Sequence, residues 1–216
     1  MLTFTSADAS QAGIFTLNPE QGAPKQIKAG KGEYRQVAFD EQGNRLAFLY
    51  CAEKDSAYKA LTLYLSEQQA PAKEIAARGN QAFPTNWVIS EHGTLQFSKA
   101  STRLYFGTSP EPRQKDTTQL AENRPNVQVW SWNEPVQYTV QDYNKAQDLK
   151  KNYRAVYHIG KGTLVQLADK ELPNLQLANE GDGDLALLST TTPYSLSSMW
   201  EGRTRNDYYT VNVETG

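Results

Sequence analysis

Apolar and polar residues alternate with a period of two along most of this chain. Short apolar runs are separated by segments rich in Gly, Pro, Asn and Asp, and stretches with the helical period of 3.6 are rare. The pattern predicts an all-β fold of antiparallel strands. One segment, 141–151 (QDYNKAQDLKK), is compatible with one or two helical turns. Strands are predicted at 14–17, 34–39, 45–50, 61–65, 73–76, 94–97, 103–107, 127–132, 136–140, 154–159, 163–168, 185–189 and 208–213.

A hairpin of strand, tight turn and strand recurs along the chain. VAFDEQGNRLAFLY, residues 37–50, returns as LQFSKASTRLYFGT, so that Phe39 and Phe97, like Leu46 and Leu104, are 58 residues apart. QLANEGDGDLALLS, residues 176–189, is a weaker third copy. In the first copy, Asp40 can hydrogen-bond the backbone of its own turn, and Gly in the turn accepts left-handed angles. The recurrence indicates a structural unit rather than a site.

A second recurring element is a strand, a Gly-containing turn and another strand. YRAVYHIGKGTLVQLAD shows it in full, GIFTLNPEQGAPKQIKAG has the same form, and DYYTVNVETG shares its first half. The first hairpin followed by the second makes a four-stranded antiparallel sheet, the blade of a β-propeller. At about 40–50 residues per blade, about three to five blades fit in one propeller segment spanning residues 1–216. The alternative is a β-sandwich or two small β-domains.

Composition and charge limit the classes of partner that this chain is expected to bind. The 22 Lys and Arg nearly balance the 24 Asp and Glu, so no strong field would attract nucleic acid or a membrane surface, and neither is predicted as a partner. No run of 18 apolar residues predicts a membrane-spanning helix. The N-terminal stretch MLTFTSADAS does not resemble a signal peptide, which predicts either a cytoplasmic protein or an export signal outside this sequence.

Candidate nucleophiles and bases are few. The G-x-S-x-G pentad of α/β-hydrolases is absent, and Ser109 in GTSP lacks the second glycine. His92, in a predicted turn, and His158, in a predicted strand, are each interpreted as a surface or core histidine in preference to a catalytic base. Cys51 ends the apolar run LAFLYC, where a buried structural thiol is the favoured interpretation. The sequence therefore predicts no catalytic residue in this chain.

Metal and cofactor motifs are also incomplete. Glu180, Asp182 and Asp184 alternate as at the start of a calcium loop, but the glycine and the final carboxylate of that loop are missing. GKGEYR, residues 30–35, resembles half of a dinucleotide-binding loop and precedes a predicted strand instead of a helix. No metal and no cofactor are predicted.

Aromatic residues give the candidate contact surface. Trp130 and Trp132 lie two apart in VQVWSWNEPVQY, so on a strand they would project to one face. Packing between sheets is the favoured interpretation of this pair, and a recognition surface is the alternative. Tyr194 and Trp200 belong to the long loop 190–206, which is the better candidate for contact with a partner.

The ordered set of segments resembles a known family. RQVAFDEQGNRLAFLY, LQFSKASTRLYFGTSP, NVQVWSWNEP, RAVYHIGKGTLVQLAD and the final LALLSTTTPYSLSSMWEGRTRNDYYTVNVETG together resemble the N-terminal β-propeller of bacterial prolyl oligopeptidase family serine peptidases, in the dipeptidyl-peptidase-like branch. The resemblance implies a propeller that caps an α/β-hydrolase domain and filters peptide substrates by size. It also implies a periplasmic or extracellular location.

The departures from that family lead to two further expectations. Because the sequence contains no hydrolase motif, the hydrolase domain and the remaining blades are expected outside this chain as its partners. The rival hypothesis is a free-standing binding module similar to TolB-type or WD-repeat propellers. An open propeller would expose strand edges and apolar faces, which predicts self-association.

Overall fold

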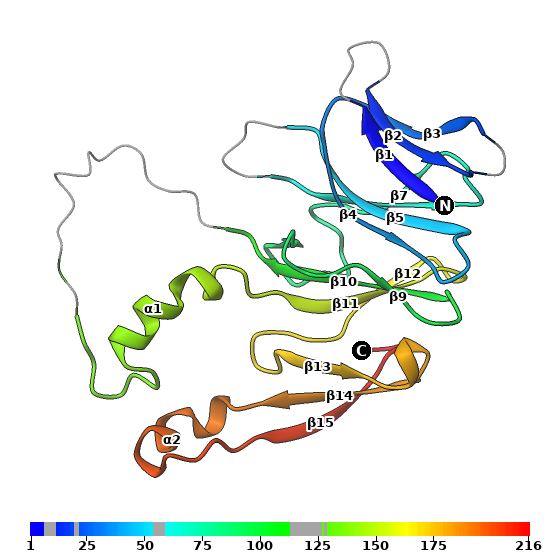
Figure 1. Ribbon diagram of the computed structural model, residues 1–216. Coiled ribbons are helices and arrows are strands. Elements are labelled where there is room, and N and C mark those ends of the chain that lie inside the picture. Colours follow the sequence, from blue (N-terminus) through cyan, green and yellow to red (C-terminus); the bar gives the residue numbers. More distant parts are fainter. Residues whose placement is uncertain (7–11, 20–21, 54–58, 113–126, 128) are drawn as a thin grey trace.

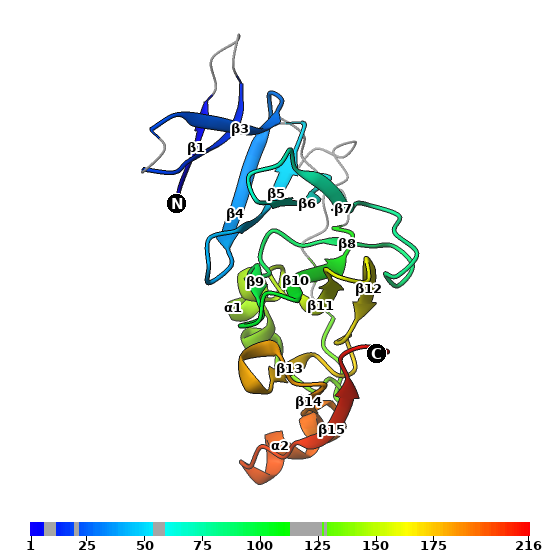
Figure 2. The same cartoon turned by 90° about the vertical axis from the view of Figure 1, so that its right-hand side faces the viewer.

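The computed structural model describes residues 1–6, 12–19, 22–53, 59–112, 127 and 129–216. Antiparallel strands form four sheets that follow one another in chain order from the N-terminal to the C-terminal sheet (Figures 1 and 2). We call these sheets blades 1 to 4. Blade 1 contains β1 (Leu2–Ser6), β2 (Gly13–Leu17) and β3 (Pro24–Ala29), and blade 2 contains β4 (Glu33–Phe39), β5 (Arg45–Cys51), β6 (Thr62–Glu67) and β7 (Lys73–Ala76).

Blades 3 and 4 continue the same arrangement. Blade 3 is ordered β12-β11-β10-β8, and β9 pairs with the other half of β10, so that β8 and β9 together take the place of one strand. Its strands are β8 (Trp87–Ile89), β9 (Gln96–Phe97), β10 (Arg103–Pro110), β11 (Tyr153–His158) and β12 (Thr163–Gln166). Blade 4 contains β13 (Asn174–Leu177), β14 (Leu185–Thr190) and β15 (Asp207–Asn212).

The strand order confirms the expected antiparallel β-propeller segment, here with four blades. The first recurring hairpin is β4–β5 in blade 2, β9–β10 in blade 3 and β13–β14 in blade 4. The second is β2–β3, β6–β7 and β11–β12 in blades 1 to 3. In blade 4 the register places Leu185 opposite Asn212, as Arg45 lies opposite Glu67 and Arg103 opposite His158.

Two strand predictions are wrong. The described residues of 127–132 form no strand, and the segment 136–140 leads instead into helix α1 (Tyr138–Asp148). Helix α1 is longer than the one or two turns predicted at 141–151. Helix α2 (Ser195–Glu201) and the strands β1 and β8 were not predicted from the sequence. A two-residue alternation identifies a strand only where a neighbouring strand supplies backbone partners, and the described residues of 127–140 lie outside the sheets.

Consecutive blades pack face to face. Blades 2, 3 and 4 share a large core that includes Leu49, Leu63, Phe106, Val156 and Leu188. A smaller core joins blades 1 and 2, and it consists of Ile14, Ile27, Leu46 and Phe48. Successive residues of β5 therefore point alternately to blade 1 and to blade 3, as the period of a strand requires.

Arginines fasten successive blades at the end of the sheets that carries the tight turns. Arg45 starts β5 and donates from Nη1 to the carbonyl oxygen of Ser101 at 2.8 Å, in the turn before β10. Arg103 starts β10 and donates to the carbonyl oxygens of Gly181 (3.3 Å) and Gly183 (2.7 Å), in the turn before β14. We call these two contacts the arginine clasps, and the sequence pattern did not predict them.

Close backbone contact also shapes blade 3. Gly93, between β8 and β9, lies so near Gly107 of β10 that a Cβ atom on Gly107 would come within 2.4 Å of the Gly93 Cα atom. The missing side chains allow the chain to pass directly over the strand.

Candidate functional site

The long connections of the described blades gather at one end of the sheets, which we call the loop end. Their described parts are 52–53, 59–61, 111–112, 127, 129–152 and 191–206, and these parts lie opposite the tight turns 40–44, 98–102 and 178–184 (Figure 1). Of these connections, 54–58, 113–126 and 128 are outside the described residues. Loops held on a rigid scaffold are where binding residues usually lie, so the loop end is the candidate functional site.

The first arm of the loop end is the described part of 127–149, which includes helix α1. Trp130 stacks on Tyr138 with ring centroids 5.2 Å apart and is 62% exposed, and Trp132 is 90% exposed. The favoured interpretation, that this pair fills space between sheets, is therefore wrong. Helix α1 has no buried residue, and Tyr143 is 88% exposed. The arm presents apolar rings to solvent.

The second arm of the loop end is 192–202, which includes helix α2. Tyr194 is anchored, because its hydroxyl donates to Asp207 Oδ1 at 2.7 Å. This hydrogen bond to a carboxylate is the main cause of the raised pKa of Tyr194. Trp200 is 84% exposed, and Met199 is exposed beside it in sequence. Both arms extend from the same side of the blades (Figure 1), so the predicted contact residues share one end of the molecule.

A network of charged side chains lies at the base of the loop end, between blades 2 and 3. Arg35 Nε donates to Glu33 Oε1 at 2.8 Å, and Lys59 Nζ donates to Glu33 Oε2 at 2.5 Å. Arg35 also forms an ion pair with Glu91, so the two carboxylates share one guanidinium. The hydrogen bonds from Lys59 and Arg35 lower the pKa of Glu33.

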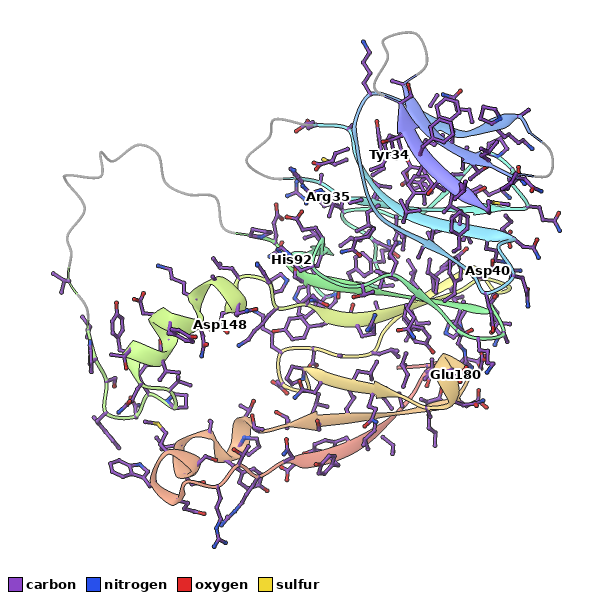
Figure 3. All side chains as sticks on the ribbon, in the orientation of Figure 1. Tyr34, Arg35, Asp40, His92, Asp148 and Glu180 are labelled. Carbon is purple, nitrogen blue, oxygen red and sulfur yellow. The ribbon has the colours of Figure 1, made fainter. Side chains whose placement is uncertain are left out.

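His92 adjoins this network. Figure 3 shows Arg35 and His92 near the junction of β4 with blade 3, with Asp148 on helix α1 nearby. A cavity of about 170 Å³ is lined there by residues that include Lys59, His92 and Leu149. Partial burial is the largest cause of the lowered pKa of His92, followed by the positive charges of Lys150 and Arg35. The sequence did not identify this network, because its members come from three separate segments.

The other candidate residues have structural contacts. His158 is buried, and its Nε2 lies 3.1 Å from the carbonyl oxygen of Val213, so it joins blade 3 to the segment after β15. Cys51 is 1% exposed and its thiol donates to the carbonyl oxygen of Glu53, which confirms the buried thiol. Gly30 has a φ of 141° and precedes the strand β4, as the sequence predicted for the GKGEYR segment.

The acidic residues considered as a calcium loop contact blade 3 instead. Glu180 forms an ion pair with Lys99 at 2.8 Å, Asp182 Oδ2 accepts the Ala100 N–H at 2.8 Å, and Asp184 pairs with Arg103 at 2.9 Å (Figure 3 labels Glu180). Within the described ranges, no group of three or more His, Cys, Asp and Glu side chains is placed to hold a metal ion. Nor does any helix of the described chain have the length and apolarity to cross a membrane.

Comparisons with known proteins found matches among solved structures. No protein-family model and no curated protein matches the chain. TolB from Acinetobacter baumannii is similar with a TM-score of 0.39 and 12% identity over 99% of this chain and 38% of TolB. The tricorn protease is similar with a TM-score of 0.34 and 10% identity over 93% of this chain and 25% of that protein. The chain thus spans well under half of either protein, and its propeller class rests on the repeated blades themselves.

Proposed function

We propose that this chain is the non-catalytic propeller portion of a prolyl-oligopeptidase-like serine peptidase. In this proposal the loop end selects the peptides that reach a hydrolase domain outside the chain. The ordered sequence resemblance supports the family, and the four blades supply the rigid scaffold that such a filter needs.

The observation that carries the proposal is the pair of arms at the loop end. Trp130, Trp132 and Trp200 expose 62%, 90% and 84% of their surfaces there. Exposed aromatic rings provide large apolar contacts at a small cost in side-chain entropy, and they suit extended peptides that contain proline. Contiguous exposed apolar groups on a soluble protein usually mark such contact sites.

Peptide binding tests the selecting role. Proline-containing peptides titrated onto the 216-residue chain should change its tryptophan fluorescence, because exposed indole rings respond to a change of solvent contact. Trp132→Ala and Trp200→Ala should weaken binding severalfold, whereas Gln42→Ala, at an exposed position in the tight turn 40–44 opposite the loop end, should leave it unchanged. Equal binding by all the variants would contradict a role for the arms.

Hydrolysis tests the non-catalytic role. Aminoacyl-proline and aminoacyl-alanine reporter substrates should remain intact with this chain alone. Turnover that a serine-directed reagent abolishes would refute the claim that the chain is inert.

The alternative is a free-standing propeller that binds a protein partner through the same arms. Reading the codons that follow Gly216 in the gene separates the two hypotheses. A continuing reading frame that encodes G-x-S-x-G supports the peptidase. A stop codon directly after Gly216 supports the free-standing module.

A further inference from the structure

We propose that two copies of this chain associate head to tail, with the uncovered face of blade 4 docked on the uncovered face of blade 1 of the other copy. In such an assembly the second copy takes the place that the peptidase resemblance gives to further blades, so the two expectations compete for the same two faces. It starts from the way in which blades pack within one chain.

Blade 2 shows what a covered face contains. Phe48 of β5 and Tyr64 of β6 lie opposite each other and stack, with ring centroids 5.6 Å apart and planes at 11°. Ile14 and Ile27 of blade 1 belong to the same buried cluster as Phe48, and Lys28 Nζ lies 4.4 Å from the centre of the Tyr64 ring. The face of blade 1 that looks toward blade 2 thus covers this aromatic pair.

Blade 1 repeats this aromatic pair on its opposite face. Phe4 of β1 and Phe15 of β2 lie opposite each other, with ring centroids 5.3 Å apart and planes at 7°. Phe4 is nevertheless 44% exposed, and Leu2 beside it is 58% exposed. We call this surface the blade 1 outer face. Like the face of blade 2 that packs on blade 1, it carries a stacked aromatic pair. In the described structure Phe48 of blade 2 is fully buried, whereas Phe4 of blade 1 remains 44% exposed.

Blade 4 has the matching uncovered surface. Ala186 and Leu188 of β14 point into the large core, so the alternate residues Leu185 and Leu187 point away from it and are 55% and 37% exposed. Tyr208 of β15 lies on this side and is 64% exposed. We call this surface the blade 4 outer face. It corresponds to the faces of blades 1, 2 and 3 that look toward the next blade.

Neither outer face carries a charged side chain at its described strand positions. The strand register assigns to the blade 4 outer face Asn174, Gln176, Leu185, Leu187, Ser189, Tyr208, Thr210 and Asn212, and to the blade 1 outer face Leu2, Phe4, Ser6, Gly13, Phe15, Leu17, Pro24, Gln26 and Ala29. Charged residues make up 21% of the whole chain. A solvated sheet face usually carries charges, and their depletion characterises the centre of an interface.

These features favour a second copy of this chain as the molecule that packs on the two outer faces. Inside the chain, a face toward the next blade always packs on a face toward the preceding blade, so two identical outer faces do not complement each other. A second copy supplies the missing face of the right kind at both ends. Such a head-to-tail contact either closes into a ring or builds an open chain. Two copies of four blades make eight, which is within the range of about 4–8 blades in closed propellers.

Light scattering coupled to size exclusion measures the assembly. The 216-residue chain should have twice its formula mass of 24.2 kDa at high concentration. Phe4→Asp on the blade 1 outer face and Leu187→Asp on the blade 4 outer face should each give mostly monomer. Val129→Asp changes an 86% exposed residue on the first arm and should leave the mass unchanged.

Mixing the two variants is the decisive measurement. Phe4→Asp keeps an intact blade 4 outer face and Leu187→Asp keeps an intact blade 1 outer face, so their mixture should recover a two-copy species. A contact between identical faces would not recover in this way. A monomeric native chain, a mixture that stays monomeric, or dissociation by Val129→Asp would overturn the proposal, and a mass above two copies would overturn ring closure.

A second pair of variants keeps the test valid if either substitution unfolds the chain. Leu2 and Tyr208 are 58% and 64% exposed, so Leu2→Asp and Tyr208→Asp remove little buried surface. Far-ultraviolet circular dichroism identifies which variants keep their strands, and the same mass and mixing results are expected from this pair.

Discussion

Replacing Arg103 with methionine should loosen blade 4 from blade 3. The Arg103 side chain is only 12% exposed, and it donates to the carbonyl oxygens of Gly181 and Gly183 and to the Asp184 carboxylate. Methionine keeps the apolar stem and removes all three hydrogen bonds. Arg103→Met therefore isolates the polar part of the clasp.

The expected loss follows from the geometry of each bond. The 2.7 Å bond to Gly183 joins a charged donor to a carbonyl in a partly buried turn, and such bonds contribute about 1.5–3 kcal/mol. The 3.3 Å bond to Gly181 is longer and weaker. Asp184 is 87% exposed in its side chain, so its ion pair adds about 0–1 kcal/mol. We expect a loss of about 2–4 kcal/mol, or about 5–15 °C in Tm for a chain of this length.

Urea unfolding followed by circular dichroism measures the loss, and two variants serve as controls. Asp184→Asn removes only the exposed ion pair and should cost less than about 1 kcal/mol. Arg45→Met removes the other clasp, whose side chain is 31% exposed, and should cost less than Arg103→Met. Amide hydrogen exchange should accelerate in residues 174–212 before residues 45–67. A change of less than about 0.5 kcal/mol in the unfolding free energy of Arg103→Met, or an equal cost from Asp184→Asn, would show that the clasp does not hold blade 4 on blade 3.

Three further predictions concern packing and protonation. Gly107→Ala should destabilise the chain by about 1–3 kcal/mol because its new Cβ meets the Gly93 backbone, whereas Gly160→Ala, which meets nothing within 4 Å, should be close to neutral in urea unfolding; equal effects would contradict the close crossing. Burial lowers the pKa of His158 from its usual 6.5, so the unfolded chain binds a proton that the folded chain does not. The unfolding free energy should therefore fall as the pH drops below about 6.5, and His158→Asn should reduce that slope; an unchanged slope would be evidence against it. Cys51, 1% exposed, should react with a thiol reagent only as fast as the chain unfolds, and immediate labelling in native buffer would contradict its burial.

Local sequence chemistry predicted the first recurring hairpin well. Asp40 Oδ1 accepts the Arg45 N–H at 2.9 Å, and Gly43 has a φ of 71°, as the turn residues indicated. The register places Phe39 opposite Leu46 and Phe97 opposite Leu104, so the two copies of the hairpin pair in the same way. These features involve residues close together in sequence, where side-chain size and turn preference act directly.

The same kind of pattern failed where the outcome depended on distant neighbours. The alternation around Trp130 and Trp132 suits a strand, but the residues described there pair with no sheet edge, and the two rings are exposed on an arm. The charged network of Glu33, Arg35 and Glu91 could not be predicted either, because strand pairing and blade packing bring its members together.

The sequence by itself determined most of the strands, the turns of the recurring hairpins and the repeated blade, because the period of two and the turn residues restrict the backbone locally. Only the tertiary structure decided that the two arginines of the repeat clasp successive blades and that the four candidate aromatic residues share the loop end. It also decided which two sheet faces remain uncovered. Each of these results depends on which segments meet in space, and a short stretch of sequence does not contain that information.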